Sequence, residues 1–385
     1  MDKVGAGSTA GREEGRAAGE EWVFPGGVTD EVRAKADSHS MTTIRELSGQ
    51  EHEHVFAFRD EASGLNGYLA IHNTRFGPAF GGIRIGPYRS DLAALTDALR
   101  LSRAMTFKVA LAGLPCGGGK LVMVEHLGLR RRQAFEEVGK LVELCGGRFF
   151  TGPDVGVMAE DLQVVRAMTK YCSEECSPAL GDIGEHTAIG VWHAMRACVE
   201  ALGLRQPRVA IQGVGHVGMH LARILHCGGL DLIVCDIDRD RTRAAEREFG
   251  AKVVPPDDIF EADCDVFAPC ALGAVINVHT VGKLCARIVC GSANNVLASR
   301  EDGDALHRRG ILYAPDYLAN AGGVIRGVEY YLESKPHSKV SLSRIYDRMK
   351  DVIEAAKQRN SSTAQIADER VEERLKASEL SPAGA

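Results

Sequence analysis

Residues 208–225 read RVAIQGVGHVGMHLARIL, and this stretch decides the fold. An apolar strand runs into Gly213, Gly215 and Gly218, which have the spacing G-x-G-x-x-G, and an amphipathic helical segment follows. In a Rossmann unit such glycines allow a tight turn, and the pyrophosphate of a dinucleotide lies at the N-terminus of the helix. The alternative is a glycine-rich turn that only packs a helix on a sheet.

A second strand follows at the expected distance. Residues 232–235 are apolar and end at Asp236, about twenty residues past the glycines, where an acid accepts hydrogen bonds from the adenosine ribose. Strand, glycines, helix, strand and acid in this order predict dinucleotide binding. Asp236 favours NAD over NADP because its charge repels a 2′-phosphate, although Arg239 and Arg241 weaken that inference.

Two lysines, Lys108 and Lys120, occur in an otherwise apolar stretch, and a run of three glycines precedes the second. Burial removes hydration from an ammonium group and lowers its pKa, and a second cation nearby lowers it further. One lysine could then act as a general base near neutral pH while the other holds a carboxylate. The alternative is a pair of lysines on the surface of a helix and a loop.

The composition fits a globular enzyme. A chain of 385 residues with 45% hydrophobic content can bury two cores, which predicts two domains. The net charge of −6 argues against a nucleic-acid partner. No apolar run has the length of a membrane span, and the N-terminus lacks the apolar core of a signal peptide. We therefore expect a cytoplasmic protein with no membrane partner.

The 11 cysteines are scattered along the chain, and we expect reduced thiols. Cys172 and Cys176 have an i, i+4 spacing and His186 follows, which is a conceivable metal site. Without a second close ligand pair, ordinary buried thiols are the simpler interpretation, so the sequence predicts no metal. Cys116 stands beside the glycines that precede Lys120, and we expect it to pack there.

Composition and periodicity describe the remaining segments. Residues 1–40 are rich in Gly, Ala, Glu and Arg and are predicted to be disordered. Residues 68–72 have the character of a strand, and apolar positions at helical spacing predict a helix over 91–106. From about residue 342 onward the chain is predicted to be helical with charged faces.

Short motifs follow one another along the chain. They are DEASGL at 60–65, GPAFGGIR at 77–84, MTFK at 105–108, GGGK at 117–120, GPDVG at 152–156, PCALGA at 269–274 and YAPDYLANAGG at 313–323. In this order and spacing they resemble the glutamate/leucine/phenylalanine/valine dehydrogenase family, and most closely its leucine dehydrogenase branch. The resemblance extends from about residue 41 to the C-terminal region.

The resemblance implies an α/β fold of two domains. Residues 41–187 together with 331–385 would form an N-terminal α/β substrate-binding and oligomerisation domain, and residues 188–330 would form an inserted Rossmann domain that binds NAD. A C-terminal helix would pack back on the first domain, and the protein would be a homo-oligomer.

The implied activity is the reversible NAD-dependent oxidative deamination of an apolar L-amino acid, of the leucine, valine, isoleucine or phenylalanine type, to a 2-oxo acid, ammonium and NADH. By resemblance, Lys120 is the base that activates water. Lys108 holds the α-carboxylate as a permanent cation and helps depress the pKa of Lys120. Asp154 exchanges protons with the substrate nitrogen; otherwise it only forms a turn. Asn320 binds substrate from the nucleotide domain; otherwise it is a helix N-cap or part of a tight turn.

The family also assigns cofactor contacts to the glycine loop, to the segment GSANN at 291–295 and to a threonine whose alternative role is a helix N-terminal cap. These cofactor-binding residues are Gly213, Val214, Gly215, His216, Val217, Gly218, Asp236, Ala293, Asn294 and Thr187.

Phe80 governs the expected specificity. Glutamate-specific relatives carry a lysine here that pairs with the side-chain carboxylate, and an apolar ring cannot replace it. Phe80 and Ile83 also depart from the pattern of branched-chain and aromatic-specific relatives. Phe80 therefore either narrows the pocket toward valine or leucine or stacks on an aromatic substrate. Gly81, Gly82 and Met105 would also lie on the substrate side.

Two other functions stay open. A family member could be diverted to biosynthesis and act on an aromatic amino acid or its 2-oxo acid. A protein of another class, a non-catalytic NAD-binding regulator, could also keep the fold. Lys108, Lys120 and Asp154 argue against the regulator, because a binding module needs no lysine with a depressed pKa.

Overall fold

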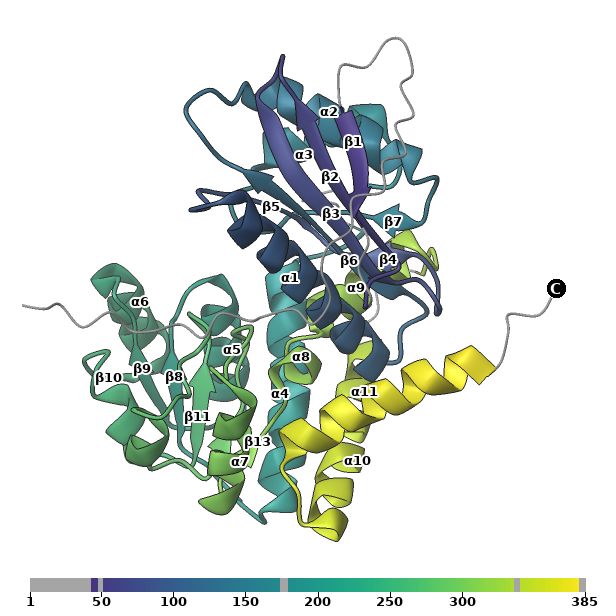
Figure 1. The fold of residues 1–385 in the computed structure, drawn as a ribbon. Helices are drawn as coiled ribbons and strands as arrows, with labels where there is room; N and C mark the ends of the chain where they lie inside the picture. Colours follow the sequence, from purple (N-terminus) through teal and green to yellow (C-terminus); the bar gives the residue numbers. More distant parts are fainter. Residues whose placement is uncertain (1–42, 48–50, 174–178, 336–339, 381–385) are drawn as a thin grey trace, which may run out of the picture.

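Two β-sheets lie at opposite ends of the molecule, and a group of helices connects them (Figure 1). This arrangement is seen in a computed structural model that describes residues 43–47, 51–173, 179–335 and 340–380. The segment 1–40, for which the sequence predicts disorder, and Cys176 lie outside these residues.

The first sheet is mixed and has 7 strands. They are β1 (Thr43–Leu47), β2 (His54–Asp60), β3 (Leu65–Asn73), β4 (Ala79–Phe80), β5 (Ile83–Gly86), β6 (Gly117–Val124) and β7 (Phe149–Phe150). The order is β1-β2-β3-β6-β4-β7, with β5 paired to β6. The first four strands in this order are antiparallel, whereas β4, β5 and β7 join in parallel. The predicted strand at 68–72 is confirmed as part of β3.

Helices cover both faces of the first sheet. The pair α2 (Arg131–Leu144) and α3 (Ala159–Met168) packs on one face, where Phe135 is fully buried. The opposite face is covered by α1 (Asp91–Leu111), which buries Ala98 against the sheet. The predicted helix over 91–106 is therefore confirmed, and it continues to Leu111. It begins after Ser90, whose side chain accepts a hydrogen bond from a backbone N–H of the first turn.

The three glycines at 117–119 begin β6 and do not form a loop. A Cβ added at Gly118 would lie 2.1 Å from the backbone nitrogen of Thr106 on α1. Only a residue without a side chain lets the helix lie this close to the sheet. The close approach places Lys108 on α1 and Lys120 on β6 near enough for their charges to interact.

The second sheet has 6 strands, and all neighbours are parallel. They are β8 (Val209–Gln212), β9 (Leu232–Cys235), β10 (Lys252–Val253), β11 (Val266–Pro269), β12 (Ile288–Val289) and β13 (Leu312–Tyr313). The order β10-β9-β8-β11-β12-β13 is the 3-2-1-4-5-6 order of a Rossmann fold. The strands predicted around the glycine motif are thus confirmed as β8 and β9. The order reverses beside β8, which is where such sheets form their ligand crevice.

Side chains alternate between two cores across the second sheet. Val209 and Ile211 point to the core shared with α5 (His216–Cys227) and α6 (Arg239–Phe249). Ala210 between them points to the core on the other face, which includes residues of α7 (Arg300–Arg308) and the short helix η1 (Ile259–Glu261). The short helix η2 (Val281–Lys283) lies on the connection to β12.

A central helix, α4 (Ile183–Ala201), runs between the two sheets (Figure 1). It contacts α8 (Asp316–Ala319), α9 (Gly322–Tyr331), the short helix η3 (Val340–Ser343) and α10 (Arg344–Arg359). The last helix, α11 (Thr363–Leu380), contacts α1 of the first domain, as predicted, and also α7 beside the second sheet. Among the described residues, no helix combines the length and the apolar character that crossing a bilayer requires.

Candidate active site

Lys120 and Asp154 form a close ion pair within the first domain. Lys120 stands on β6 with only 5% of its surface exposed, and Asp154 follows β7 in a loop. The Lys120 Nζ atom lies 2.6 Å from Asp154 Oδ2. Burial lowers the pKa of Lys120, Asp154 opposes that shift, and the guanidinium of Arg84 adds to it. The direction agrees with the sequence-based prediction, and Arg84 is a neighbouring cation that the sequence analysis did not name.

Arg84 is a site residue that the sequence analysis did not single out. Its Nε donates to Asp154 Oδ2 at 2.8 Å, and its Nη1 donates to Asp97 Oδ2 at 3.2 Å. The hydroxyl of Tyr88 donates to the same Asp97 oxygen at 2.8 Å. Burial disfavours the charged form of Asp154, but Lys120 and Arg84 outweigh this and lower its pKa. Arg84 closes the quoted GPAFGGIR motif, but its partner on α1 is visible only in three dimensions.

Two glycines let the strands of the site approach one another. A Cβ added at Gly81 would lie 1.8 Å from the carbonyl oxygen of Gly119, and one at Gly82 would lie 2.6 Å from the carbonyl oxygen of Pro153. Larger residues at these positions would push the Asp154 loop away from β6. Gly81 and Gly82, predicted on the substrate side, therefore lie directly against the backbone that carries Lys120 and Asp154.

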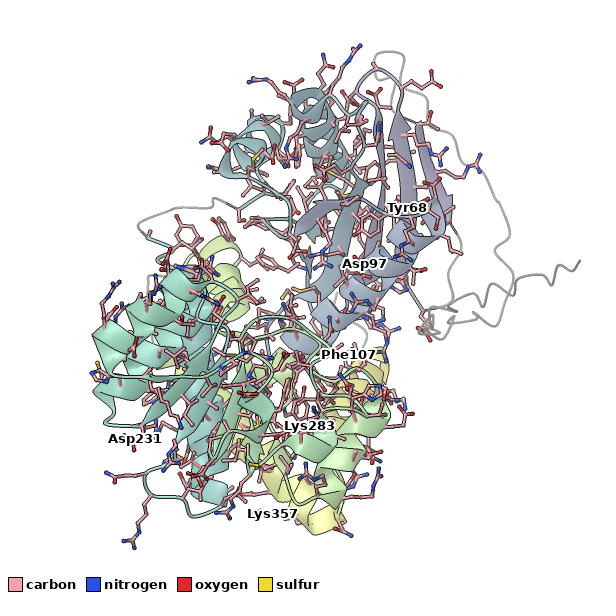
Figure 2. The ribbon with its side chains drawn as sticks, turned by 90° about the vertical axis from the view of Figure 1, so that its left-hand side faces the viewer. Tyr68, Asp97, Phe107, Asp231, Lys283 and Lys357 are labelled. Carbon is pink, nitrogen blue, oxygen red and sulfur yellow. The ribbon has the colours of Figure 1, made fainter. Side chains whose placement is uncertain are left out.

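Lys108 reaches from the first domain to the second. It lies on α1 one residue after Phe107, which Figure 2 shows at the junction of the two halves. Its Nζ donates to Asn294 Oδ1 at 3.1 Å. Burial and the charge of Lys120 lower the pKa of Lys108 to about 8, while Asp316 opposes the shift. Lys108 therefore carries its charge below that pH and loses it as the pH rises further.

Asp316 is a second residue that the sequence analysis missed. It begins α8, is buried, and accepts hydrogen bonds from the backbone N–H groups of Val296 at 2.8 Å and Tyr317 at 2.7 Å. Burial raises its pKa, while these N–H groups and Lys108 oppose the shift. It is part of the quoted YAPDYLANAGG motif, but the motif does not show that its carboxylate interacts with the charge of Lys108.

Asn320 offers a free acceptor toward the site. It ends α8 as the C-cap, so the alternative of a helix N-cap is wrong. Its Nδ2 donates to Asn294 Oδ1 at 2.9 Å and lies within 3.3 Å of the carbonyl oxygens of Ser292 and Ala293. The Asn320 Oδ1 atom is buried and has no partner within the described part of the chain. An unpaired buried acceptor costs roughly 1–3 kcal/mol, so a ligand N–H donor would be well placed there.

The glycine loop has the geometry that a dinucleotide requires. Gly213 has a φ of +92°, and a Cβ at Gly218 would lie 2.1 Å from the carbonyl oxygen of Gly213. Gly215 is the N-cap of α5, and no side chain accepts a hydrogen bond there. The N–H groups of the first turn at His216 and Val217 therefore point out of the helix end and fit a pyrophosphate.

Two charged side chains flank this loop. Asp236 follows β9 and accepts hydrogen bonds from the backbone N–H groups of Val214 and Asp238, each at 2.9 Å. A Cβ at Gly215 would lie 3.3 Å from Nη1 of Arg241, so a guanidinium also lies over the loop. Arg241 pairs with Asp238 at 3.2 Å, and Arg239 begins α6 with its side chain exposed.

Thr187 lies one turn inside α4, so it is not the N-terminal cap of that helix. The cap is Asp182, whose carboxylate accepts hydrogen bonds from the backbone N–H groups of Gly184 and Glu185. The Thr187 hydroxyl donates to the carbonyl oxygen of Ile183 at 2.8 Å.

An aromatic row lies beside the lysine–aspartate pair. Phe80 on β4 stacks on Phe150 with a centroid distance of 5.5 Å and an interplanar angle of 4°. Phe150 in turn contacts Tyr331 of α9 at 5.1 Å. The edge of the Phe80 ring faces Gly327, where an added Cβ would lie 3.4 Å away. Met105 on α1 is half-buried and packs against the main core.

Cys116 and Cys172, the thiols of the sequence analysis that lie within the described residues, are buried. Burial raises the pKa of both Cys116 and Cys172 to about 12, which makes the reactive thiolate scarce near neutral pH. His186 is fully buried, and its Nδ1 lies 2.5 Å from the carbonyl oxygen of Asp182. Cys116 therefore packs, as predicted.

A Rossmann sheet with a pyrophosphate-type loop in one half and the Lys120–Asp154 ion pair in the other point to a nucleotide-dependent oxidoreductase. The family model described as Glu/Leu/Phe/Val dehydrogenase, dimerisation domain, matches residues 52–177, and the model described as Glutamate/Leucine/Phenylalanine/Valine dehydrogenase matches residues 228–380. The chain belongs to this family and is an amino acid dehydrogenase. Enzymes of this family use a nicotinamide cofactor.

Two relatives show how far the similarity extends. A leucine dehydrogenase of Geobacillus stearothermophilus is 42% identical over 344 residues, which cover 87% of this chain and 94% of the relative. An L-tryptophan dehydrogenase of Nostoc punctiforme is 38% identical over 347 residues, or 88% of this chain and 97% of the relative. The crystal structure of the Nostoc punctiforme enzyme has a TM-score of 0.76 at 37% identity and covers 86% of this chain and 98% of that one.

Proposed function

We propose that this protein catalyses the reversible NAD-dependent oxidative deamination of an apolar L-amino acid to the 2-oxo acid, ammonium and NADH. The observation that carries the proposal is the ion pair of buried Lys120 with half-buried Asp154, 2.6 Å apart, in a domain whose Lys108 reaches Asn294 of the Rossmann half. Such a pair can deliver and accept protons where water is scarce.

Substrate binding would use groups from both domains. Lys108, charged below a pH of about 8, would hold the α-carboxylate. The unpaired Oδ1 of Asn320 would accept a hydrogen bond from the α-amino group. When bound at the glycine loop, the nicotinamide cofactor supplies the hydride acceptor for the α-carbon. The residues of the two domains therefore fix the α-carbon between them.

Proton transfer would be divided between the two members of the ion pair. Asp154 would take a proton from the substrate ammonium before the hydride leaves the α-carbon, and would return one to the nitrogen as the C–N bond breaks. Lys120, with its pKa lowered by burial, would take a proton from the water that attacks the imine carbon. Their contact at 2.6 Å would let a proton pass directly between them. Arg84 would keep Asp154 ionised between these steps.

The substrate class is argued from the aromatic row. Phe80 offers no positive charge to a side-chain carboxylate, so glutamate would lose its partner in an apolar pocket. One face of the Phe80 ring already lies on Phe150, and the ring edge reaches Gly327. We infer an apolar substrate of the leucine, valine or phenylalanine type. The same aromatic row favours a second candidate, a biosynthetic role for an aromatic amino acid or its 2-oxo acid.

NAD is the proposed cofactor because Asp236 lies at the end of β9, where its charge repels a 2′-phosphate. Its carboxylate accepts a hydrogen bond from the backbone N–H of Val214 in the glycine loop. A homo-oligomer is also proposed, since the first family model describes a dimerisation domain. The cytoplasmic location expected from the sequence is kept as part of the proposal.

The proposal is tested by following NADH formation with each of the twenty L-amino acids and NAD at alkaline pH. We expect activity with branched-chain or aromatic substrates and at least about a hundredfold less with glutamate. A preference for one aromatic amino acid would support the biosynthetic candidate. Absence of turnover with every amino acid, together with intact NADH binding, would identify a non-catalytic regulator instead.

A further inference from the structure

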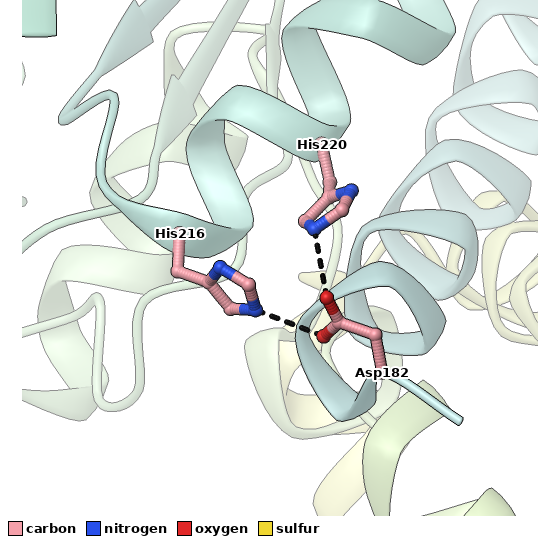
Figure 3. A group of neighbouring side chains, drawn as sticks. All are labelled: Asp182, His216 and His220. Carbon is pink, nitrogen blue, oxygen red and sulfur yellow. Dashed lines mark hydrogen bonds and ion pairs between the residues drawn. The ribbon is translucent and has the colours of Figure 1, made fainter. Parts of the chain in front are cut away.

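Three side chains outside the lysine–aspartate site converge between α4 and α5. Asp182 is the N-cap of α4, and His216 and His220 lie one turn apart on α5 (Figure 3). His216 Nε2 lies 2.8 Å from Asp182 Oδ1, and His220 Nε2 lies 3.1 Å from Asp182 Oδ2. The two imidazole rings stand edge to face with a centroid distance of 4.9 Å. One carboxylate thus contacts two imidazoles that project from the same face of a neighbouring helix.

This set of donors is one that divalent transition metals prefer. Two histidines and one carboxylate form a facial triad that leaves coordination positions open. The three donor atoms all lie within 4.8 Å of one another. Zinc bonds of about 2.0–2.2 Å require tetrahedral ligand atoms roughly 3.3 Å apart. Small side-chain rotations would reach this spacing, because the side chains of Asp182, His216 and His220 are 37%, 66% and 22% exposed.

The surrounding backbone holds the site in place. The N–H groups of Gly184 and Glu185 donate to Asp182 Oδ1 at 2.7 and 3.2 Å, which orients the carboxylate as hydrogen bonds to metal ligands do. A Cβ added at Gly184 would lie 2.3 Å from Cδ2 of His216. The absence of a side chain at Gly184 therefore gives the His216 ring its place against α4.

We propose that Asp182, His216 and His220 bind one divalent metal ion of the zinc type, which links the start of α4 to the glycine loop. Each imidazole would ligate the ion through Nε2 and keep its proton on Nδ1, so metal binding replaces the two present contacts with Asp182. Because His216 directly follows Gly215 in that loop, the ion fixes the loop against the central helix. The site is independent of the proposed amino acid chemistry.

The test is a titration of the metal-free full-length chain with Co²⁺, followed by displacement with Zn²⁺. Visible absorption of Co²⁺ distinguishes nitrogen and oxygen ligands from thiolates, which matters because Cys227 and Cys285 are exposed. We expect one saturable equivalent with nitrogen and oxygen ligands. The variant His220→Asn should bind Co²⁺ at least about tenfold more weakly, since loss of one of three ligands removes a main part of the affinity.

A matched control is His226→Asn, which removes an exposed histidine of the same helix outside the cluster. It should bind Co²⁺ like the unmutated chain. Zn²⁺ should also raise the unfolding temperature of the unmutated chain and of His226→Asn, because a ligand of the native state stabilises it, but not that of His220→Asn. Equal Co²⁺ binding by His220→Asn and the unmutated chain, or a thiolate spectrum, would overturn the proposal and leave Asp182 as a helix cap only.

Discussion

The lysine–aspartate pair of the first domain and the glycine loop of the second prepare their ligands in opposite ways. Lys120 is buried and Asp154 is half-buried, and their charges are held 2.6 Å apart, so their protonation states respond to small changes nearby. At Gly213 and Gly218 the important property is the absence of a side chain, which leaves space beside the free N–H groups at the start of α5. Changes in the first region should therefore alter proton transfer, and changes in the second should alter affinity.

The largest effect is expected from Lys120→Ala. If Lys120 is the general base, turnover should fall by roughly three decades, because general base catalysis alone contributes about 10²–10⁴-fold. Binding of NADH, measured by its fluorescence, should be unchanged because the glycine loop is intact. Near-normal turnover in this variant would remove Lys120 from the mechanism.

Gly218→Ala should weaken cofactor binding and leave the proton-transfer residues intact. The new Cβ would lie 2.1 Å from the Gly213 carbonyl oxygen, and overpacking of this kind costs about 1–3 kcal/mol. NADH affinity should fall about tenfold to a hundredfold, while the lysine–aspartate pair is untouched. Gly282→Ala is a matched control, because no heavy atom lies within 4 Å of a Cβ added there. Unchanged NADH binding in Gly218→Ala would show that the loop is not a tight cofactor cradle.

Lys108 connects the two regions, and its titration should make substrate binding depend on pH. It is charged below a pKa of about 8 and loses its charge above it, so carboxylate binding should be full below that pH and weaken as pH rises. The affinity of the enzyme–NADH complex for the 2-oxo acid, measured without ammonium, should fall about fivefold between pH 8 and pH 9. Lys108→Ala should bind weakly at every pH and show no such step. If the fall in affinity between pH 8 and pH 9 persists in Lys108→Ala, another group is responsible for it.

A smaller effect is expected at the ribose end of the loop. Asp236→Ser should narrow the preference for NAD over NADP by roughly tenfold, because one repulsive charge beside the 2′-phosphate is removed. The ratio of kcat/KM for the two cofactors measures this. Equal use of both cofactors by the unmutated enzyme would show instead that Arg241, which lies over Gly215, binds the 2′-phosphate.

The smallest effect concerns the substrate side chain. Phe80→Leu should change the ranking of substrates by a few fold, the scale of one or two methylene groups in an apolar pocket. If Phe80 narrows the pocket, bulky substrates improve relative to valine; if it stacks on the substrate, aromatic substrates lose most. An unchanged ranking of kcat/KM would show that Phe80 does not line the pocket.

The features predicted best from the sequence are those formed by residues close together along the chain. Strand, glycines, helix and Asp236 follow one another within one supersecondary unit, so their order alone indicated the Rossmann half, and β8, α5 and β9 lie where expected. The helix over 91–106 was also correct, because its periodicity depends on neighbours within a few turns. Lys120 was singled out by its apolar, glycine-flanked stretch, whereas its role as the base and the choice of Asp154 came from family resemblance, since no spacing indicates that they touch.

The site features that could not be predicted from the sequence depend on contacts between distant segments. The bond between Arg84 and Asp97 joins β5 to α1, and the unpaired oxygen of Asn320 is defined only by the neighbours that surround it. Asp182 and His216 are 34 positions apart, so their contact is visible only in the structure, whereas the i, i+4 pair of His216 and His220 stood in the sequence and was not considered there. The partial loss of charge at Lys108 likewise follows from burial, which a motif does not show.

The contact between the last helix and α1 bears on the order in which the chain folds during synthesis. Arg374 of α11 donates a hydrogen bond to the carbonyl oxygen of Ala110, which is 264 positions earlier in the chain. The first domain emerges from the ribosome long before its covering helix exists, and at about 5–20 residues per second it waits many seconds for it. During that interval the flank of α1 is exposed to other nascent chains. A product that ends before α11 is therefore expected to aggregate, so translation must be completed before the first domain is protected.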